Sequence, residues 1–375
     1  TPLHELLFRE TAGPLVMTSG NPSSEPLCRD NDEALQRLGT IADAFLLHNR
    51  DIERRVDDSV VLSVPAEGGS RRTRGMTVPV RRARGYVPDP VSVSRRSPRP
   101  VLALGGELKS TVCILNGRNA VLSEHLGDLT NPAAYRNFLR AVDCFQEILD
   151  VRPQVVAVDR HPRYLASQFG RGLDLERVEV QHHHAHMVSC MAENGFDGPV
   201  IGVVCDGTGF GTDGTIWGCE ILLGDERGFE RTASLGTFAL PGGDRAAVET
   251  WRPAVSLALE AFGPGAWRES AASAFARLSP EALDLAEQRI RNGRGVPRTS
   301  SLGRLFDGVA FLLGLCERNR FEAEAPAALE AAALGARPGP ALSWRLEPGA
   351  GPGPLSMDVR PLVRDLVHLY ADGAS

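Results

Sequence analysis

Long apolar runs and paired cysteines are both missing from this sequence of 375 residues. No run reaches the roughly 18 apolar residues needed to cross a bilayer, so a membrane protein is not expected. The seven cysteines stand singly and never as CxxC, which argues against a zinc ribbon and against a disulfide framework. The N-terminus has no starting methionine, basic stretch or apolar run, so no secretory signal is expected. We therefore expect a cytoplasmic protein with reduced thiols, and a fragment of a longer chain.

Lysine is almost absent, because Lys109 is the only lysine among 41 basic residues. A lysine retained among arginines indicates a need for a compact, mobile ammonium group, which a planar guanidinium does not imitate. Lys109 is therefore a candidate catalytic residue, although chance retention explains it too. The net charge is −6, and 42% of the residues are hydrophobic, as in a soluble globular protein. The length allows two or three domains.

Strand-like and helix-like segments alternate, which predicts a mixed α/β fold. Residues 1–98 are expected to be the C-terminal part of one α/β domain, and residues 99–375 a second domain. The arginine-rich residues 71–100 predict a basic linker or an anion-facing loop. Hairpins with glycine-rich tips at residues 101–115 and 200–223 suggest a duplicated architecture. The expected helices cover residues 32–43, 132–149, 183–193, 251–262, 280–292 and 303–316, with strands at 45–47 and 155–158 and a last helix that stops at residue 375.

The strongest local signal is the segment Gln181-His182-His183-His184-Ala185-His186. His182 and His186 are four residues apart, so on a helix they share a face and can hold one divalent metal ion. Asp206, at a strand end, is the expected third ligand. His183 and His184 cannot join that face, so we expect them to orient the ligands or to bind substrate. The glutamate of HExxH is missing, which argues against a zinc peptidase. The alternative is a histidine-rich tract that only packs or faces solvent.

Glycine-rich segments are the second signal. Residues 206–214 have glycine at four positions, which predicts a loop whose backbone N–H groups approach an anion such as phosphate. The spacing fits neither GxGxxG nor GxxxxGK[ST], and a β-hairpin without a ligand is the alternative. Residues 105–111 place Lys109 and two hydroxyl groups in a glycine turn, which suits phosphate or a carbamoyl oxygen. Residues 18–26 form a polar loop that, by itself, is read as an ordinary turn.

These segments, in this order, resemble the HypF family of hydrogenase-maturation carbamoyltransferases across nearly the whole chain. The resemblance to its YrdC-like domain rests on residues 15–22, 48–51, 54–60 and 81–88. The resemblance to its transferase domain rests on residues 105–111, 181–186, 206–214, 241–244 and 303–307. It implies a YrdC-like α/β domain over residues 1–98, followed by a duplicated domain of the actin, sugar-kinase and Hsp70 type over residues 99–375. Both domains would be incomplete.

The resemblance also implies the chemistry. ATP and carbamoyl phosphate would give a carbamoyl-adenylate in the YrdC-like part. The transferase part, with a divalent metal that is zinc or iron, would then pass the carbamoyl group to the C-terminal cysteine of a HypE-type acceptor protein. No nucleophilic side chain of this chain is needed, because the acceptor supplies the thiol.

Residue roles follow by position from the same resemblance. The metal ligands would be His182, His186 and Asp206. The phosphate and carbamoyl contacts would be Lys109, Gly207, Thr208 and Gly209, and the adenylation-site contacts would be Thr18, Ser19, Asn21 and Arg84.

Two other readings remain. An antibiotic O-carbamoyltransferase or a tRNA threonylcarbamoyl enzyme would share both domain types, but the order found here, YrdC-like first, favours HypF over the O-carbamoyltransferases. An RNA-binding module would use the arginines between residues 71 and 99. The overall negative charge, and Tyr86 as the only aromatic residue among those arginines, argue against nucleic acid as the main partner.

Overall fold

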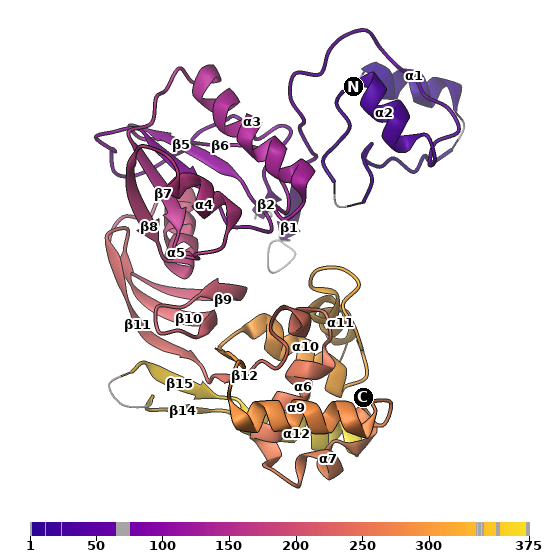
Figure 1. Ribbon diagram of the computed structural model, residues 1–375, viewed down its shortest axis with the longest axis vertical. Helices are drawn as coiled ribbons and strands as arrows, with labels where there is room; N and C mark the ends of the chain where they lie inside the picture. Colours follow the sequence, from indigo (N-terminus) through magenta and orange to yellow (C-terminus); the bar gives the residue numbers. More distant parts are fainter. Residues whose placement is uncertain are drawn as a thin grey trace, which may run out of the picture. The chain divides into compact units, whose positions relative to one another are not determined.

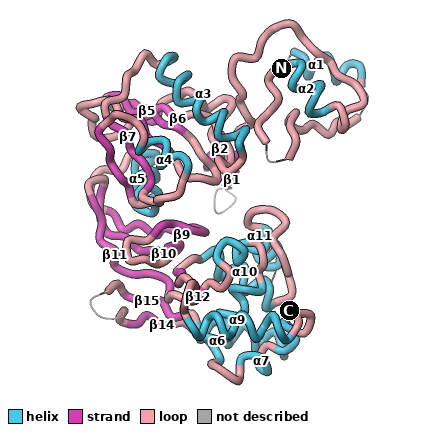
Figure 2. The backbone as a smooth tube through the Cα atoms, in the orientation of Figure 1, coloured by secondary structure: helices cyan, strands magenta, loops and turns pink. Residues whose placement is uncertain are grey.

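Helices and strands alternate through the chain, which confirms the mixed α/β class (Figure 2). The structure, a computed structural model, describes residues 2–372 apart from residues 12, 24, 65–75, 335, 337–338, 340 and 350–352. The chain divides into two compact units, residues 1–178 and residues 179–375. Each unit is described by itself below. Within the described ranges no helix is long and apolar enough to cross a membrane.

The first unit begins with segments that bury little. Helices α1 (Pro2–Glu10) and α2 (Asn31–Leu38) contain no buried residue, and strands β1 (Val60–Val64) and β2 (Met76–Arg81) form an antiparallel pair. Among the described residues before position 99, Ala83 is the only buried apolar one. This part of the chain therefore has almost no hydrophobic core of its own.

Three sequence predictions fail in this region. The helix expected over residues 32–43 ends at Leu38, because Gly39 and a turn follow. Residues 45–47 form no strand, since their backbone pairs with no other segment among the described residues. Residues 76–81 form β2 inside the stretch expected to be a linker or loop, because Thr77, Val78 and Val80 are β-branched and favour an extended backbone. Residues 71–75 of that stretch lie outside the described residues.

A sheet in the order β3-β6-β5-β4-β7-β8 forms the centre of the first unit. Strands β4 (Val101–Leu104), β5 (Val112–Asn116) and β6 (Asn119–Leu122) form an antiparallel meander, so the first predicted hairpin is confirmed. Strand β7 (Val155–Asp159) pairs with β4 in parallel. The edges are β3 (Val91–Ser92) and β8 (Glu176–Val180). Most residues of β7 are buried, as expected for a central parallel strand.

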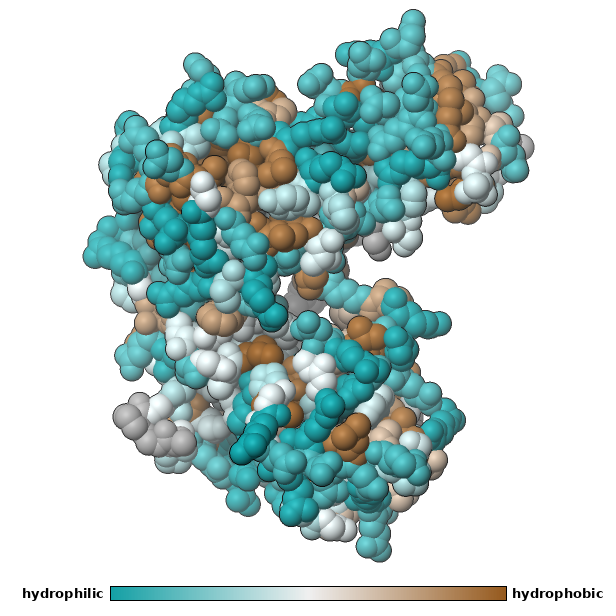
Figure 3. Space-filling view, in the orientation of Figure 1, coloured by the Kyte–Doolittle hydropathy of each residue, from teal (hydrophilic) through white to brown (hydrophobic). Residues whose placement is uncertain are grey.

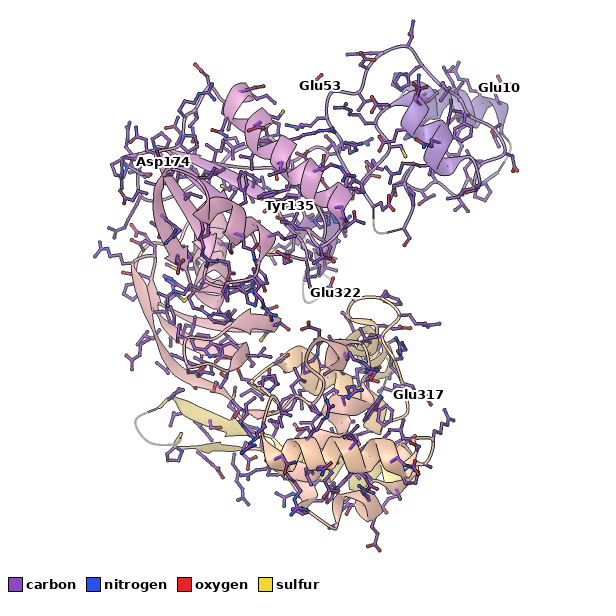
Figure 4. All side chains as sticks on the ribbon, viewed as in Figure 1. Glu10, Glu53, Tyr135, Asp174, Glu317 and Glu322 are labelled. Atoms are coloured by element: carbon purple, nitrogen blue, oxygen red, sulfur yellow. The ribbon has the colours of Figure 1, made fainter. Side chains whose placement is uncertain are left out.

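Helices α3 (Pro132–Ile148) and α4 (Leu165–Arg171) pack against this sheet (Figure 1). The buried residues of α3 recur at helical spacing, and Phe138 and Phe145 join the buried residues of β4, β5 and β7 in one cluster. Tyr135 of α3, labelled in Figure 4, stacks on Phe138 with 5.9 Å between ring centroids. The apolar face of α3 thus packs on the sheet.

The start of α3 gives a stability prediction. Asn131 is its N-cap, and the side-chain oxygen of Asn131 accepts the backbone N–H groups of Ala133 at 2.8 Å and Ala134 at 3.4 Å. Replacing Asn131 by Ala removes this acceptor, so we expect the free energy of unfolding to fall by about 1 kcal/mol. Urea denaturation measures it. Asn131→Asp is the matched control, because it keeps the acceptor, and equal losses in the two variants would contradict the capping role.

The second unit is built on a sheet of parallel and antiparallel strands in the order β12-β13-β10-β11-β15-β14, with β9 also paired to β10. Strands β9 (Val200–Phe210), β10 (Ile216–Asp225) and β11 (Gly228–Leu235) form an antiparallel meander, so two meanders of the same kind occur in the chain. Strand β15 (Leu355–Asp358) pairs with β11 in parallel and with β14 (Arg345–Glu347) antiparallel. The short strands β12 (Phe238–Ala239) and β13 (Arg298–Thr299) complete the sheet.

Helices form the second layer of this unit (Figure 1). The first, α5 (His182–Asn194), packs on β9 and β10 in a cluster with Trp217 and Leu222. The others surround a separate core that contains the buried Trp267. They are a 3₁₀ helix (Gly243–Ala247), α6 (Trp251–Phe262), α7 (Trp267–Ser270), α8 (Ala272–Phe275), α9 (Pro280–Asn292), α10 (Leu302–Leu312), α11 (Glu324–Ala333) and α12 (Arg360–Ala371). Figure 3 shows mainly hydrophilic residues on the visible face.

The glycine-rich segment of residues 206–214 differs from its prediction. Residues 206–210, expected to be part of a loop, continue β9 and pair with β10, and the turn lies at residues 211–215. Gly209 and Gly211 give room for neighbouring groups, whereas Gly214, with a φ of +81°, is part of the turn. A Cβ added to Gly209 would lie 2.2 Å from Cε1 of His183.

Candidate metal centre

The histidine segment starts α5. Gln181 is the N-cap, and its side-chain oxygen accepts the backbone N–H of His184 at 2.9 Å, while its side-chain amide donates to the Phe210 carbonyl at 3.3 Å. The first turn of α5 is thereby held against the end of β9. Helical geometry then places His182 and His186 on one face, one turn apart, as the spacing predicted.

His182, His186 and Asp206 come together, from the start of α5 and from β9. The Nε2 atoms of the two histidines are 3.3 Å apart, and Nε2 of His182 is 3.3 Å from Oδ2 of Asp206. One potential ligand atom from each of the three residues lies within 4.8 Å of the others. Two imidazoles and one carboxylate are a donor set that binds zinc or iron.

The charge state of Asp206 suits a cation. Burial would raise the pKa of its carboxyl group, but a hydrogen bond from His182, the nearby charges of His182 and His186, and the Gly207 N–H together lower it. The Gly207 N–H donates to Oδ1 at 2.6 Å. The other oxygen, Oδ2, is buried and faces Nε2 of His182 at 3.3 Å. A buried, ionised carboxylate oxygen beside two imidazoles fits a divalent metal ion.

His183 lies fully buried beside this cluster. Its Nε2 is 3.9 Å from Oδ2 of Asp206, and its ring packs edge-on to Trp217 with 5.8 Å between centroids. Burial lowers the pKa of His183 to about 4, although the Asp206 charge opposes this shift. The imidazole is therefore neutral at pH 7, and neither ring nitrogen has a hydrogen-bond partner among the described residues. His183 can help orient Asp206 or a ligand.

His184 is placed differently. Its Nε2 lies 2.7 Å from the backbone carbonyl of Asp225 at the end of β10, and its ring lies against Phe229 with 4.9 Å between centroids. These contacts tie α5 to the turn between β10 and β11. His184 is thus held by structural contacts, and it is not among the residues gathered at Asp206.

Gly207, Thr208 and Gly209 follow Asp206 along β9. The Gly207 carbonyl accepts the hydroxyl of Ser301 at 2.7 Å, and Ser301 is also the N-cap of α10. Thr208 is exposed, and its hydroxyl donates to the Gly207 carbonyl at 2.6 Å. Gly303, in the first turn of α10, also lies against Gly207. The start of α10 therefore borders the strand that carries Asp206, a feature that sequence reasoning did not assign to Ser301.

Ser301 provides a second stability prediction. Its oxygen accepts the Arg304 N–H at 3.0 Å in addition to donating to Gly207. We expect Ser301→Ala to lower the free energy of unfolding by about 1–2 kcal/mol, because a cap and a contact to β9 are both lost. Ser279→Ala, which removes only the cap of α9 at 3.2 Å, should cost less in the same urea titration. A cost of Ser301→Ala no larger than that of Ser279→Ala would contradict the double role.

The buried carboxylate of Glu220 stabilises the part of β10 that lies beside the candidate metal centre. Glu220 is fully buried, and its Oε1 accepts the N–H groups of Gly218 and Cys219 and the hydroxyl of Ser300. Its Oε2 accepts Nε of Arg231 at 2.6 Å. These bonds hold the irregular part of β10 opposite Asp206. Sequence reasoning missed Glu220, although a lone glutamate inside an apolar strand is a signal.

Arg231, which is hydrogen-bonded to Glu220, also contacts Trp217, the residue whose ring packs on His183. Its guanidinium lies 4.3 Å from the Trp217 ring centroid and also contacts Asp213 at 2.7 Å, and Asp213 accepts the Trp217 indole N–H at 3.0 Å. Trp217 is thus fixed on two sides, so the ring that packs on His183 has one position.

Lys109 lies in the first unit, in the turn between β4 and β5, and is exposed. The turn is anchored by Glu107, whose carboxylate accepts the Leu165 N–H of α4 at 2.8 Å. Burial raises the pKa of Glu107 in spite of that bond. Lys109 therefore projects from a fixed turn at the end of β4. Its contact with phosphate or a carbamoyl oxygen stays a prediction.

The predicted adenylation residues also lie in the first unit. Arg84 lines a hollow of about 500 Å³ together with Arg54 and Arg55. Thr18, Ser19 and Asn21 do not line it, and the Asn21 amide instead donates to the carbonyls of Pro22 and Glu25. Arginines around one hollow suit an anionic ligand, although each of these three already faces a carboxylate, Arg54 that of Glu124, Arg55 that of Glu33 and Arg84 that of Asp58. The structure thus adds Arg54 and Arg55 to Arg84 as anion-binding candidates.

Three family models match consecutive parts of the chain. Residues 1–72 match the Sua5, YciO and YrdC model described as "Telomere recombination", residues 96–193 match the "HypF Kae1-like domain", and residues 202–375 match "Carbamoyltransferase, Kae1-like Domain, second subdomain". A YrdC-like part thus precedes a Kae1-like part, of the actin and sugar-kinase type.

Curated relatives match nearly the whole chain. The carbamoyltransferase HypF2 of Cupriavidus necator is 43% identical over 94% of this chain, and the carbamoyltransferase HypF of Rhodobacter capsulatus is 43% identical over 91% of it. The matched regions are 43% and 45% of those proteins. The chain therefore spans less than half the length of these relatives.

Two solved HypF structures also match this chain. The crystal structure of full-length HypF in the phosphate- and nucleotide-bound form matches 99% of this chain and 47% of its own, with a TM-score of 0.90 and 38% identity. The HypF structure of T. kodakarensis matches 96% of this chain and 46% of its own, with a TM-score of 0.82 and 28% identity. The fold of the described residues is thus the fold of the corresponding parts of those proteins.

Proposed function

This chain belongs to the HypF family of carbamoyltransferases, and on that premise we propose that it is part of an enzyme that transfers a carbamoyl group during nickel-iron hydrogenase maturation. The observation that carries the proposal is the convergence of His182, His186 and Asp206 from α5 and β9. A cluster of this kind inside the Kae1-like region is what a metal-assisted transferase needs.

The substrates in this proposal are ATP and carbamoyl phosphate, which give a carbamoyl-adenylate. The arginine-lined hollow of the first unit supports the binding of phosphate groups there. The relative solved in a phosphate- and nucleotide-bound form supports the same substrate class. The acceptor is a HypE-type protein with a C-terminal cysteine. Its thiol sulfur bonds to the carbamoyl carbon, the bond to AMP breaks, and the reaction takes place in the cytoplasm.

The proposal gives each side chain a role. His182, His186 and Asp206 hold a zinc or iron ion, which when bound supplies a Lewis acid that polarises the carbamoyl carbonyl. Neutral His183 keeps Asp206 in position from its buried side. Lys109 offsets negative charge on phosphate or on the carbamoyl oxygen. His184, held by Asp225 and Phe229, serves by fixing the start of α5 and not by contact with substrate.

The domain division is part of the same proposal. Residues 1–98 carry the C-terminal part of the adenylation domain, with Arg84 and its neighbouring arginines at the substrate hollow. Residues 99–375 carry the transferase domain. The family models for residues 1–72 and for residues 96–193 support a division between them.

The transfer reaction tests the proposal. The purified, metal-loaded chain is incubated with ATP, radiolabelled carbamoyl phosphate and a peptide that ends in cysteine. We expect ATP-dependent label in the peptide, and no label in the matched peptide that ends in serine, because a hydroxyl is a much weaker nucleophile than a thiolate.

Label on the serine peptide, or label without ATP, would contradict the proposed acceptor or the proposed adenylate. An unlabelled cysteine peptide, with a chain shown separately to bind both metal and ATP, would contradict the transfer itself.

A further inference from the structure

Two cysteines of neighbouring strands face each other in the second unit. Cys205 of β9 and Cys219 of β10 are direct partners in the antiparallel register. Burial, followed by the charge and hydrogen bonding of the Cys205 thiol, raises the pKa of Cys219 to about 12. Because residues directly opposite in an antiparallel pair project from the same face, the two side chains are neighbours on one side of the sheet. Both are free thiols in this structure.

The backbone already has the spacing of a disulfide. Residues directly opposite in an antiparallel pair have Cα atoms roughly 4.5–5.5 Å apart, and disulfides join Cα atoms roughly 4.4–6.8 Å apart. A bond between Cys205 and Cys219 thus needs no change of register. Strand β10 is irregular between Trp217 and Cys219, and the bonds from the Gly218 and Cys219 N–H groups to buried Glu220 hold Cys219 in place opposite Cys205.

The two thiols differ in access to solvent. Cys205 is exposed and lines a hollow between α5 and β9, whereas Cys219 is only 7% exposed. A solution oxidant therefore meets Cys205 first. The buried partner is positioned to react next, because it lies directly across the ladder.

We propose that Cys205 and Cys219 are a redox modification site, which a hydroperoxide converts into a reversible cross-strand disulfide. The Cys205 sulfur attacks the peroxide, whose O–O bond breaks, giving a sulfenic acid and an alcohol, or water from hydrogen peroxide. The Cys219 sulfur then bonds to the Cys205 sulfur. The hydroxyl leaves with the Cys219 proton as water, so two thiols are oxidised and one peroxide is reduced. A dithiol reverses the bond by exchange.

The position of the bond gives the modification a local consequence. Cys205 directly precedes Asp206 on β9, and Gly218 directly precedes Cys219 on β10. The two strands lie so close here that a Cβ added to Gly218 would be 2.7 Å from the Asp206 carbonyl oxygen. A cross-link here fixes β9 to β10 one residue before the carboxylate of the candidate metal centre. The proposal stands on the cysteine pair and does not depend on the proposed function.

The sequence dictates how the bond is mapped. The nearest arginines are Arg177 and Arg227 and no lysine lies between them, so trypsin leaves Cys190, Cys205 and Cys219 in one peptide. Cleavage before aspartate, which includes Asp197, Asp206 and Asp213, places the three cysteines on separate peptides. The folded chain is treated with hydrogen peroxide, alkylated, cleaved in this way and analysed by mass spectrometry without reduction.

We expect the peptides of Cys205 and Cys219 to be joined, with two thiols lost per chain and both recovered with dithiothreitol. Cys205→Ser and Cys219→Ser should each abolish this cross-link. Cys190→Ser is the matched control, because Cys190 is exposed and lines the same hollow, and it should leave the cross-link intact.

Three results would overturn the proposal. They are a disulfide between Cys190 and Cys205 in place of the expected one, oxidation of Cys205 to a sulfinic acid with Cys219 still reduced, and retention of both thiols under conditions that oxidise Cys190.

Discussion

Replacing His182 and His186 together by alanine should remove the bound divalent metal from the purified protein. The two Nε2 atoms are 3.3 Å apart and lie beside Oδ2 of Asp206, so the variant retains one ligand of three. Loss of a group that merely supports a ligand costs roughly 10- to 100-fold in metal affinity, so loss of two ligands should cost at least about 100-fold. Elemental analysis after dialysis should then show near-stoichiometric metal in the wild type and almost none in the variant.

A matched control separates metal loss from damage to α5. Glu193 lies on the same helix, is exposed and is not part of the cluster, so Glu193→Gln should keep the metal. Circular dichroism should show that the double variant stays folded, because neither histidine belongs to the buried core. Metal retained in a folded double variant would contradict the ligand assignment.

Gly209→Ala should both destabilise the second unit and disturb the metal centre. The added Cβ would lie 2.2 Å from Cε1 and 2.7 Å from Nδ1 of His183, whose ring is fully buried against Trp217 and cannot move freely. Overpacking of this kind costs about 1–3 kcal/mol, so the free energy of unfolding should fall by that amount. Displacement of His183, whose Nε2 is 3.9 Å from Oδ2 of Asp206, should also weaken metal binding.

Gly207→Ala is the control for this prediction. It lies two residues away on the same strand, but a Cβ there would meet nothing within 4 Å. Urea denaturation and metal analysis of the two variants should therefore differ clearly. If Gly207→Ala were as damaging as Gly209→Ala, the effect would come from the strand backbone and not from contact with His183.

Much of the candidate metal centre was predictable because several of its residues lie close together in the sequence. The spacing of His182 and His186 fixes their common face as soon as the segment is helical, and the N-cap Gln181 lies next to them in sequence. Asp206 was expected at a strand end; it lies within β9, where that strand meets the first turn of α5.

The remainder depends on tertiary contacts that no local pattern reveals. A glycine-rich stretch reads as a loop from its sequence, yet residues 206–210 form a strand, because Gly209 makes room for His183. Ser301 and Glu220 act through partners far along the chain, Gly207 and Ser300 respectively, so their roles appear only in the fold. Similarly, the three adjacent histidines look alike in sequence, but His184 bonds to Asp225 on another element.

The predictions for the first unit were less complete for a related reason. Among the described residues before position 99, only Ala83 is buried and apolar, so periodicity has little core to report. The helix expected over residues 32–43 was consequently too long, and the strand expected at residues 45–47 does not form. The hairpin of β4 and β5, which does border a core, was predicted with nearly its observed limits.

The central claim is that His182, His186 and Asp206 bind one metal ion together. Titration of the metal-free protein with cobalt(II), followed by visible absorption, tests it most directly, in the wild type and in Asp206→Asn. We predict one equivalent bound by the wild type, with the intense absorption of a four- or five-coordinate site, and an affinity at least about 10-fold lower with an altered spectrum in Asp206→Asn. Equal affinities and identical spectra in the two proteins would contradict the claim, because Asp206 would then not be a ligand.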